Sequence, residues 1–179
     1  MEACPVRSID YVFILCLALL AFAVVLPHAR KKPLRFPVRV QRLREGAVLP
    51  VYGSEHAAGA DLCACLDAAA EIAPGQTVMI PTGLAVELPE GWAGLIYARS
   101  GLASKKDLAP ANKVGVVDSD YRGELLVALH NHGGEVRRVE PGDRVAQLVL
   151  APAPQAVFEK TDALSGTARG SGGFGSTGK

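Results

Sequence analysis

The sequence predicts an all-β domain, a jelly-roll-like barrel or double sheet, over residues 38–164. Short apolar runs follow one another after Pro37, and Gly, Pro or Asp interrupts them at short intervals. These interrupting residues are typical of turns. No long window shows the 3.6-residue apolar period of an amphipathic helix. Many short strands with turns between them indicate a barrel or a double-sheet jelly roll.

Each expected strand is a run rich in Val, Leu, Ile or Ala that turn residues bound. In chain order these runs are residues 37–43, 58–66, 76–80, 83–88, 93–98, 125–131 and 144–150. Turns are expected at Pro74-Gly75, Pro89-Glu90-Gly91, Gly133-Gly134 and Pro141-Gly142. At most one helical turn fits around residues 100–105, after the strand at 93–98.

Residues 1–37 form a basic, apolar leader that differs from the rest of the chain. Residues 12–26 carry no charge, and Arg30, Lys31 and Lys32 follow them. A helix of this length spans roughly 22 Å, short of the roughly 30 Å of a bilayer core. Three interpretations stay open: an anchor that leaves the body in the cytoplasm, a secretory signal, or a start codon assigned too early, so that the working protein begins near Val38.

Charge and cysteine content exclude some classes of protein. The formal net charge of the chain is +1, which is too balanced for a protein that binds nucleic acid by charge alone. Its 4 cysteines form no disulfide framework, which is consistent with a reducing compartment. Cys63 and Cys65 are expected on one face of a strand, but two ligands are too few for a metal site.

Residues 165–179 form a glycine-rich tail that cannot build a core of its own. We expect this segment to be mobile when it is alone. Its single Arg and Phe, spaced among small polar residues, favour a lid that orders over a ligand. The alternative is a flexible terminus without a function.

Two patterns in the body suggest chemistry. Arg99, Ser100 and Gly101 follow the predicted strand 93–98 and combine a guanidinium, a hydroxyl and a glycine amide, which suits an anion. Further along, Asp118 and its acidic neighbours precede Tyr121, and a carboxylate held near a phosphate can act as a general base for water. The alternative for the second pattern is a solvated acidic hairpin.

Five segments together resemble the five ordered motifs of the trimeric dUTPase family. They are residues 58–62, 99–103, 112–123, 142–148 and 169–178. The match covers the body and tail, so the leader is an unusual apolar extension. Ala60 and Ala98 depart from the family pattern, which often has Tyr and Pro there, but neither position supplies a reacting group.

The resemblance implies a jelly-roll-like homotrimer with active sites at subunit interfaces, in the cytoplasm. Such enzymes hydrolyse dUTP to dUMP and pyrophosphate with Mg²⁺, which removes dUTP and supplies dUMP for dTMP synthesis. The alternatives are a dCTP deaminase of the same structural superfamily, which normally lacks the glycine-rich tail, and a non-catalytic nucleotide-binding or membrane-tethered regulator.

The resemblance also assigns roles to individual residues. Asp118 corresponds to the general base, Asn112 and the backbone around Val117 to the uracil-reading hairpin, and Tyr121 to the residue under the deoxyribose. The residues assigned to the phosphates are Arg99, Ser100, Gly101 and Gln147. In the tail, Arg169 would meet the γ-phosphate and Phe174 would stack on uracil, and the other assigned tail residues are Ser171, Gly173 and Ser176. Asp61 corresponds to a carboxylate that reaches Mg²⁺ through water.

Overall fold

A computed structural model describes residues 35–173 of the chain. The chain divides into two units, residues 1–37 and residues 38–179, and the second unit carries the fold described below. The apolar segment 12–26 and the tail residues Phe174 and Ser176 lie outside the described residues. Within the described range, no helix is both long and apolar enough to span a membrane.

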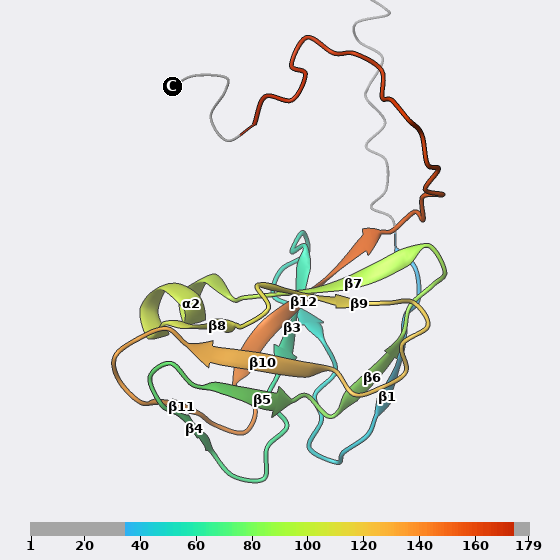
Figure 1. Cartoon of the computed structure of the whole chain (residues 1–179). Coiled ribbons are helices and arrows are strands. Elements are labelled where there is room, and N and C mark those ends of the chain that lie inside the picture. Colours follow the sequence, from blue (N-terminus) through green and yellow to red (C-terminus); the bar gives the residue numbers. More distant parts are fainter. Residues whose placement is uncertain (1–34, 174–179) are drawn as a thin grey trace, which may run out of the picture. The chain divides into compact units, whose positions relative to one another are not determined.

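Strands make up most of the described secondary structure, with one short helix (Figure 1). The strands are β1 (Arg39–Arg42), β2 (Val51–Tyr52), β3 (Gly59–Cys63), β4 (Ala70–Ile72), β5 (Thr77–Pro81), β6 (Leu84–Glu87), β7 (Trp92–Tyr97), β8 (Leu108–Pro110), β9 (Val114–Val117), β10 (Leu126–Asn131), β11 (Arg137–Val139) and β12 (Arg144–Pro152). The helix is α2 (Ser100–Lys106).

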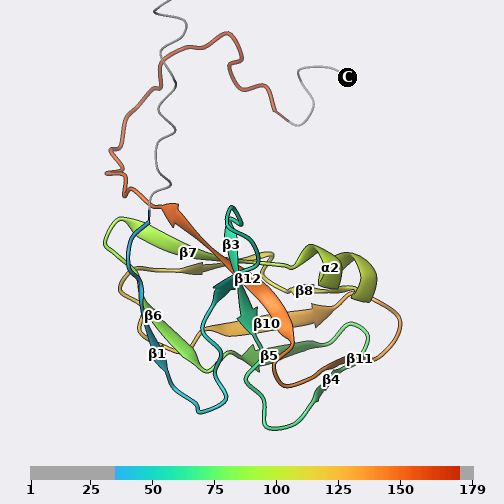
Figure 2. The same cartoon turned by 180° about the vertical axis from the view of Figure 1, so that it is seen from behind.

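The strands form antiparallel sheets whose neighbours are mostly far apart in sequence. The largest has the order β2-β3-β12-β7-β9, and a second has the order β5-β10-β8. Two smaller pairs, β1-β6 and β11-β4, complete the described strands, and Figure 2 shows them from behind. Crossovers of this kind are typical of jelly rolls, so the predicted all-β, jelly-roll-like fold class is confirmed.

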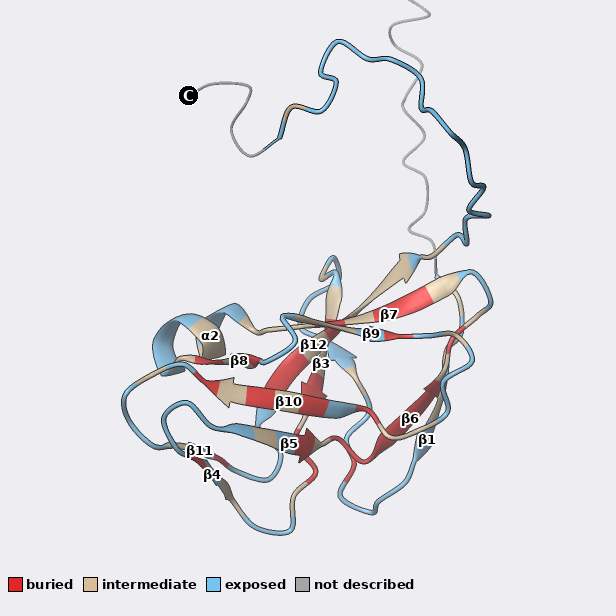
Figure 3. Ribbon diagram, in the orientation of Figure 1, coloured by how far each residue is buried: buried red, intermediate tan, exposed pale blue. Residues whose placement is uncertain are grey.

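The core lies between the sheets and consists of aliphatic side chains. Buried and less buried residues alternate along β3 and β10, as expected for strands with one face on a core. Leu62, Ile80 and Leu129 are fully buried, and Figure 3 shows the buried positions concentrated on the inner strands. Each such side chain contributes about 1.5–3 kcal/mol on burial. Packing of this core holds in place the paired strands on which the candidate site residues lie.

All seven predicted strands and the four predicted turns are present. The helix is longer than the single turn expected, because it runs to Lys106 before Asp107 adopts a left-handed conformation (φ 55°) and its N–H bonds to Leu102 O. The short strands β2, β4, β8, β9 and β11 were not predicted. They contain two to four residues each, too few to show a period, and their partners are distant in sequence.

The expectation for Cys63 and Cys65 is wrong, because strand β3 ends at Cys63. Beyond it, Ala64 N donates to Asp143 O at 2.8 Å and Cys65 N donates to Pro81 O at 2.7 Å. Successive amides therefore bond to two different segments, and the chain leaves the ladder. Cys65 is buried in the core, whereas Cys63 is only half-buried.

Candidate active site

Antiparallel pairing brings three of the predicted site residues together at one end of the large sheet. Gln147 on β12 lies opposite Asp61 on β3 and, on its other side, opposite Tyr97 on β7. Arg99 follows two residues after Tyr97, at the end of β7. We call the group of Asp61, Arg99, Arg144 and Gln147 the arginine corner.

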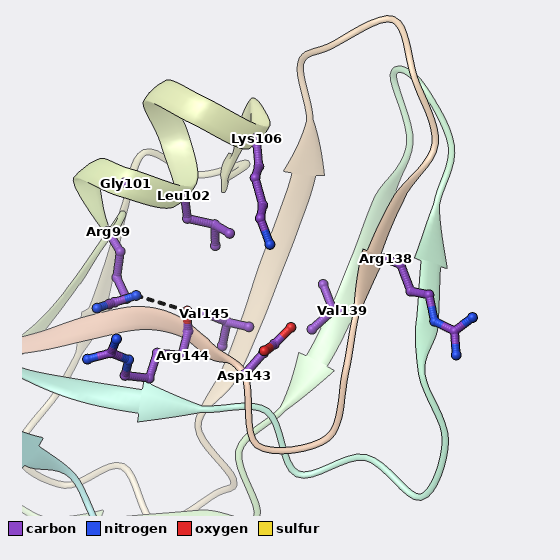
Figure 4. A pocket seen from close by; sticks show the side chains of 9 residues that line it. All are labelled: Arg99, Gly101, Leu102, Lys106, Arg138, Val139, Asp143, Arg144 and Val145. Atoms are coloured by element: carbon purple, nitrogen blue, oxygen red, sulfur yellow. Dashed lines mark hydrogen bonds between the residues drawn. The ribbon is translucent and has the colours of Figure 1, made fainter.

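One carboxylate holds two guanidinium groups in the arginine corner. Asp61 Oδ1 accepts from Arg99 Nε at 2.7 Å, and Asp61 Oδ2 accepts from Arg144 Nη1 at 3.1 Å. Arg99 Nη1 also donates to Arg144 O at 3.5 Å (Figure 4). Because two positive charges share one negative charge, the corner keeps a positive excess that suits an anion. Arg144 was not predicted as a site residue, although it lies within the motif-like segment 142–148.

Gln147 is held in a fixed orientation beside the corner. Its Nε2 donates to Ala98 O at 2.9 Å. A Cβ on Gly59 would lie 2.7 Å from Gln147 Oε1, so only glycine leaves this amide its present position. The side chain is therefore preorganised for a polar ligand.

A cavity of about 220 Å³ opens between the arginine corner and helix α2. Its lining residues are Arg99, Gly101, Leu102, Lys106, Arg138, Val139, Asp143, Arg144 and Val145. Figure 4 shows the Lys106 side chain directed into this cavity and the Arg138 guanidinium directed away from it. Lys106 was also missed by the sequence analysis, because a lysine in the last turn of a helix has an ordinary role at the helix dipole. The cavity is cationic, as a phosphate-binding site requires.

A second group of predicted residues lines a separate pocket of about 280 Å³. Asn112, Val117, Asp118 and Tyr121 all contribute to its wall. The remaining wall comes from the apolar residues Met79, Ile96, Val116, Leu125 and Leu126, together with Gly115 and the charged Glu124. We call this cavity the Asp118 pocket. Its mixture of an apolar wall with a few polar groups is typical of small-molecule sites.

The backbone around β9 shapes this pocket, but not as the hairpin that was predicted. Strand β9 pairs with β7 and forms the edge of the large sheet, and no other strand lies within residues 112–121. Lys113 has a φ of 66°, and Tyr121 N donates to Asp118 O at 3.2 Å. A turn at each end of β9 therefore presents Asn112 and Asp118 at the two ends of one strand.

The two cavities share no lining residue. Within this chain, the arginine corner and the Asp118 pocket are thus separate cavities, which we call the two candidate half-sites. The described tail residues belong to neither cavity: Arg169, Ser171 and Gly173 are exposed, and Arg169 Nε donates locally to Gly172 O at 2.8 Å. Phe174 and Ser176 lie outside the described residues.

Cys63 lies near the arginine corner but is not suited to nucleophilic chemistry. Burial raises the pKa of its thiol, and the nearby carboxylate of Asp61 raises it further. The reactive form of cysteine is the thiolate. Cys63 therefore stays protonated near neutral pH.

Comparison with known proteins agrees with this geometry. The sequence model of the dUTPase family matches residues 45–178. The deoxyuridine 5'-triphosphate nucleotidohydrolase of Desulfitobacterium hafniense is 57% identical over 131 residues, which cover 73% of this chain and 87% of that protein. The protein of the same name from Syntrophotalea carbinolica is 48% identical over 141 residues, which cover 79% of this chain and 96% of that protein.

Solved structures show the same fold. The dUTPase of Staphylococcus bacteriophage 80alpha with dUpNHpp has a TM-score of 0.75 and 26% identity, over 81% of this chain and 100% of that one. An all-β fold with a cationic corner and a carboxylate-bearing pocket fits a nucleotide hydrolase. The chain belongs to the dUTPase family, as the resemblance predicted.

Proposed function

We propose that the protein hydrolyses dUTP to dUMP and pyrophosphate by attack of water on the α-phosphorus. The observation that carries this proposal is the sorting of the predicted residues into two groups of complementary chemistry. One is a cationic corner for phosphates, and the other is a pocket in which apolar side chains lie beside the carboxylates of Asp118 and Glu124. Family membership and the dUpNHpp in the phage relative support dUTP as the substrate.

The Asp118 pocket is the proposed site of the nucleoside. Asn112 and the backbone around Val117 would hydrogen-bond uracil, while Tyr121 would pack under the deoxyribose. A cytosine amino group would be left without a partner among groups placed for uracil, at a cost of about 1–3 kcal/mol. The methyl group of thymine would be excluded by volume.

The arginine corner is the proposed site of the triphosphate. Arg99 and Arg144 present guanidinium groups, which bind phosphate oxygens in a bidentate manner. Ser100, Gly101 and Gln147 would add a hydroxyl, a backbone amide and a side-chain amide. From the tail, Arg169 would contact the γ-phosphate, Phe174 would cover uracil, and Ser171, Gly173 and Ser176 would close around the phosphates.

Asp118 is the proposed general base. It lines the Asp118 pocket and also borders a wider cavity of about 760 Å³ next to Ser119, so water can approach its carboxylate. Asp118 would accept a proton from the attacking water as the new bond to the α-phosphorus forms. The bond from the α-phosphorus to the bridging oxygen would then break, and pyrophosphate would leave with the electron pair.

The residues present fit a Mg²⁺ ion that the triphosphate itself holds. Among the described residues, no group of three or more His, Cys, Asp or Glu side chains is arranged around a metal position. Asp61 already accepts from two arginines, but an ionised carboxylate has about four lone-pair sites and can still accept from a metal-bound water. When bound, the ion would neutralise charge on the phosphates and on the leaving pyrophosphate.

We further propose a homotrimer with shared active sites, acting in the cytoplasm to remove dUTP and supply dUMP. The separation of the arginine corner from the Asp118 pocket supports sharing, because one chain presents the two halves in different cavities. A substrate that touches both halves would then lie between two chains, and the tail would complete the site.

Pyrophosphate release from dUTP, dCTP, dTTP and UTP tests the proposal directly. We expect release from dUTP and far slower release from the other three. Ammonia release from dCTP would instead indicate a deaminase. Nucleotide binding without any turnover would indicate a regulator.

A further inference from the structure

The ring of Tyr121 is held by its own turn rather than by the core. The residue is 44% exposed, so burial alone does not fix its position. Its hydroxyl donates to Glu124 O at 3.1 Å. The ring also lies directly against Gly123, since a Cβ on that glycine would come within 2.6 Å of Tyr121 Cζ. The ring therefore occupies space that only glycine leaves free.

The side chain of Glu124 anchors the carbonyl that Tyr121 contacts. Glu124 Oε1 accepts from Gly83 N at 2.8 Å, and Oε2 accepts from Arg44 Nη2 at 3.5 Å. This side chain is only 20% exposed. Gly83 has a φ of 69°, and a Cβ there would lie 2.8 Å from Ala47 Cβ, so the amide that Glu124 accepts from is itself fixed in place.

The next residue fastens the same turn to the core. Leu125 N donates to Leu84 O at 2.7 Å, and Leu125 O accepts from the fully buried Thr82 Oγ1 at 2.7 Å. The backbone on which Tyr121 rests is thus tied to the connection between β5 and β6 by side-chain and backbone bonds. This connection does not belong to any of the motif-like segments.

We propose that Gly123 and Glu124 are positioning residues that hold the Tyr121 ring as a fixed wall and so set the preference for deoxyribose over ribose. The inference rests on the proposed function, in which Tyr121 packs under the sugar. The ring can exclude a 2′-hydroxyl only if it cannot move away from the sugar. A half-exposed ring without these contacts could move away at little cost in free energy. Gly123 leaves the space that the ring occupies, and Glu124 holds in position the carbonyl that accepts the hydrogen bond from the Tyr121 hydroxyl.

The variant Gly123→Ala tests the wall, because the added methyl group must displace the ring. We expect the ratio of kcat/KM for dUTP to that for UTP to fall by about tenfold or more, as changes of one methyl-sized group in a pocket do. The KM for dUTP should rise while kcat for dUTP changes much less. Gly134→Ala is the matched control: an added Cβ there meets nothing within 4 Å, and the ratio should stay at the wild-type value.

Two variants test Glu124, and they differ in whether the side chain can still accept a hydrogen bond from Gly83 N–H. Glu124→Ala removes the acceptor for Gly83 N–H, and we expect it to lower the dUTP-to-UTP ratio. Glu124→Gln keeps an oxygen that can accept from Gly83 N–H and loses the charge that faces Arg44 and borders the Asp118 pocket, with almost no change of shape, so it should restore most of the ratio. Thermal unfolding of each variant establishes that the measured protein is folded.

The same ratio is measured without turnover by the binding of dUpNHpp and of its ribose counterpart. An unchanged ratio in folded Gly123→Ala and Glu124→Ala, or an equal loss for both sugars, overturns the inference. If the wild-type protein binds dUpNHpp but releases no pyrophosphate from dUTP, the proposed function is overturned instead. The ratio of the affinities for dUpNHpp and for its ribose counterpart then still tests whether Gly123 and Glu124 position the Tyr121 ring.

Discussion

At the residue scale, the proposed general base Asp118 lies on a turn at the end of an edge strand. It follows directly after β9, its carbonyl accepts from Tyr121 N at 3.2 Å, and its side chain lines the pocket. The carboxylate thus lies on a turn whose backbone is closed by a hydrogen bond. A base held in this way needs little reorganisation before it accepts a proton.

The variant Asp118→Asn should bind the nucleotide and fail to turn it over. The amide has nearly the same shape but cannot accept the proton, so kcat should fall by about a hundredfold or more. Pyrophosphate release measures kcat, and calorimetry with dUpNHpp measures the affinity. The exposed Asp67, which lies in neither half-site, supplies the control Asp67→Asn, whose kcat should match the wild type. Near-normal turnover by Asp118→Asn would refute its assignment as the base.

Sequence reasoning missed Arg144 because its contacts depend on strand register. Arg144 lies opposite Cys63 in the ladder and reaches diagonally to Asp61. It lies within the motif-like segment 142–148, but the resemblance assigns it no role among the 19 Lys and Arg residues of the chain. Asp61 and Asp118 could be selected because motif-like segments surround them. The contact of Asp61 with Arg144 could not be predicted, because a pairing between β3 and β12 is not visible in either segment alone.

At the element scale, every strand of five or more residues was predicted, whereas most of the shorter strands were not. Strand β10 has six residues that alternate in burial, which gives a clear two-residue period. Strand β9 has only four residues, and its place at the sheet edge is decided by pairing with β7. The predicted hairpin at 112–121 failed for the same reason: the segment finds its partner elsewhere in the fold rather than within itself.

The tail is the element whose removal should separate catalysis from folding. Every residue from 154 to 171 is exposed, and β12 is the last described strand before the tail. Deletion of residues 168–179 should therefore leave the melting temperature unchanged. It should lower kcat/KM for dUTP by about a hundredfold or more, because the γ-phosphate and the base lose their covering groups.

Calorimetric melting and pyrophosphate release measure these two effects on the same sample. The control is Lys160→Ala, which changes an exposed residue upstream of the deleted segment and should alter neither quantity. Wild-type kcat/KM in the truncated protein would show that the tail is not a lid. A large drop in melting temperature would show that it belongs to the folded body.

At the scale of the whole molecule, the sheet order explains why the two candidate half-sites of one chain lie in different cavities. In the order β2-β3-β12-β7-β9, the arginine corner uses residues of β3 and β12 and the segment after β7, whereas the Asp118 pocket lies beside the edge strand β9. An edge strand is open to a second chain. The sequence resemblance proposed members of the site, but their division between two cavities follows from crossovers that no local pattern encodes.

Shared sites predict that two inactive variants rescue each other. Arg99→Ala damages only the arginine corner, and Asp118→Asn damages only the Asp118 pocket. In a trimer that mixes both chains at random, a site is intact when an Arg99→Ala chain supplies Asp118 and an Asp118→Asn chain supplies Arg99. About one site in four meets this condition, so an equal mixture, refolded or co-expressed together, should recover about a quarter of wild-type activity.

Native mass spectrometry of the same sample measures the trimers and their composition. The matched control pairs Asp118→Asn with Asn112→Ala, two defects in the same pocket, and should recover nothing. Mixed trimers without recovered activity in the first pair would show that each site is built by a single chain.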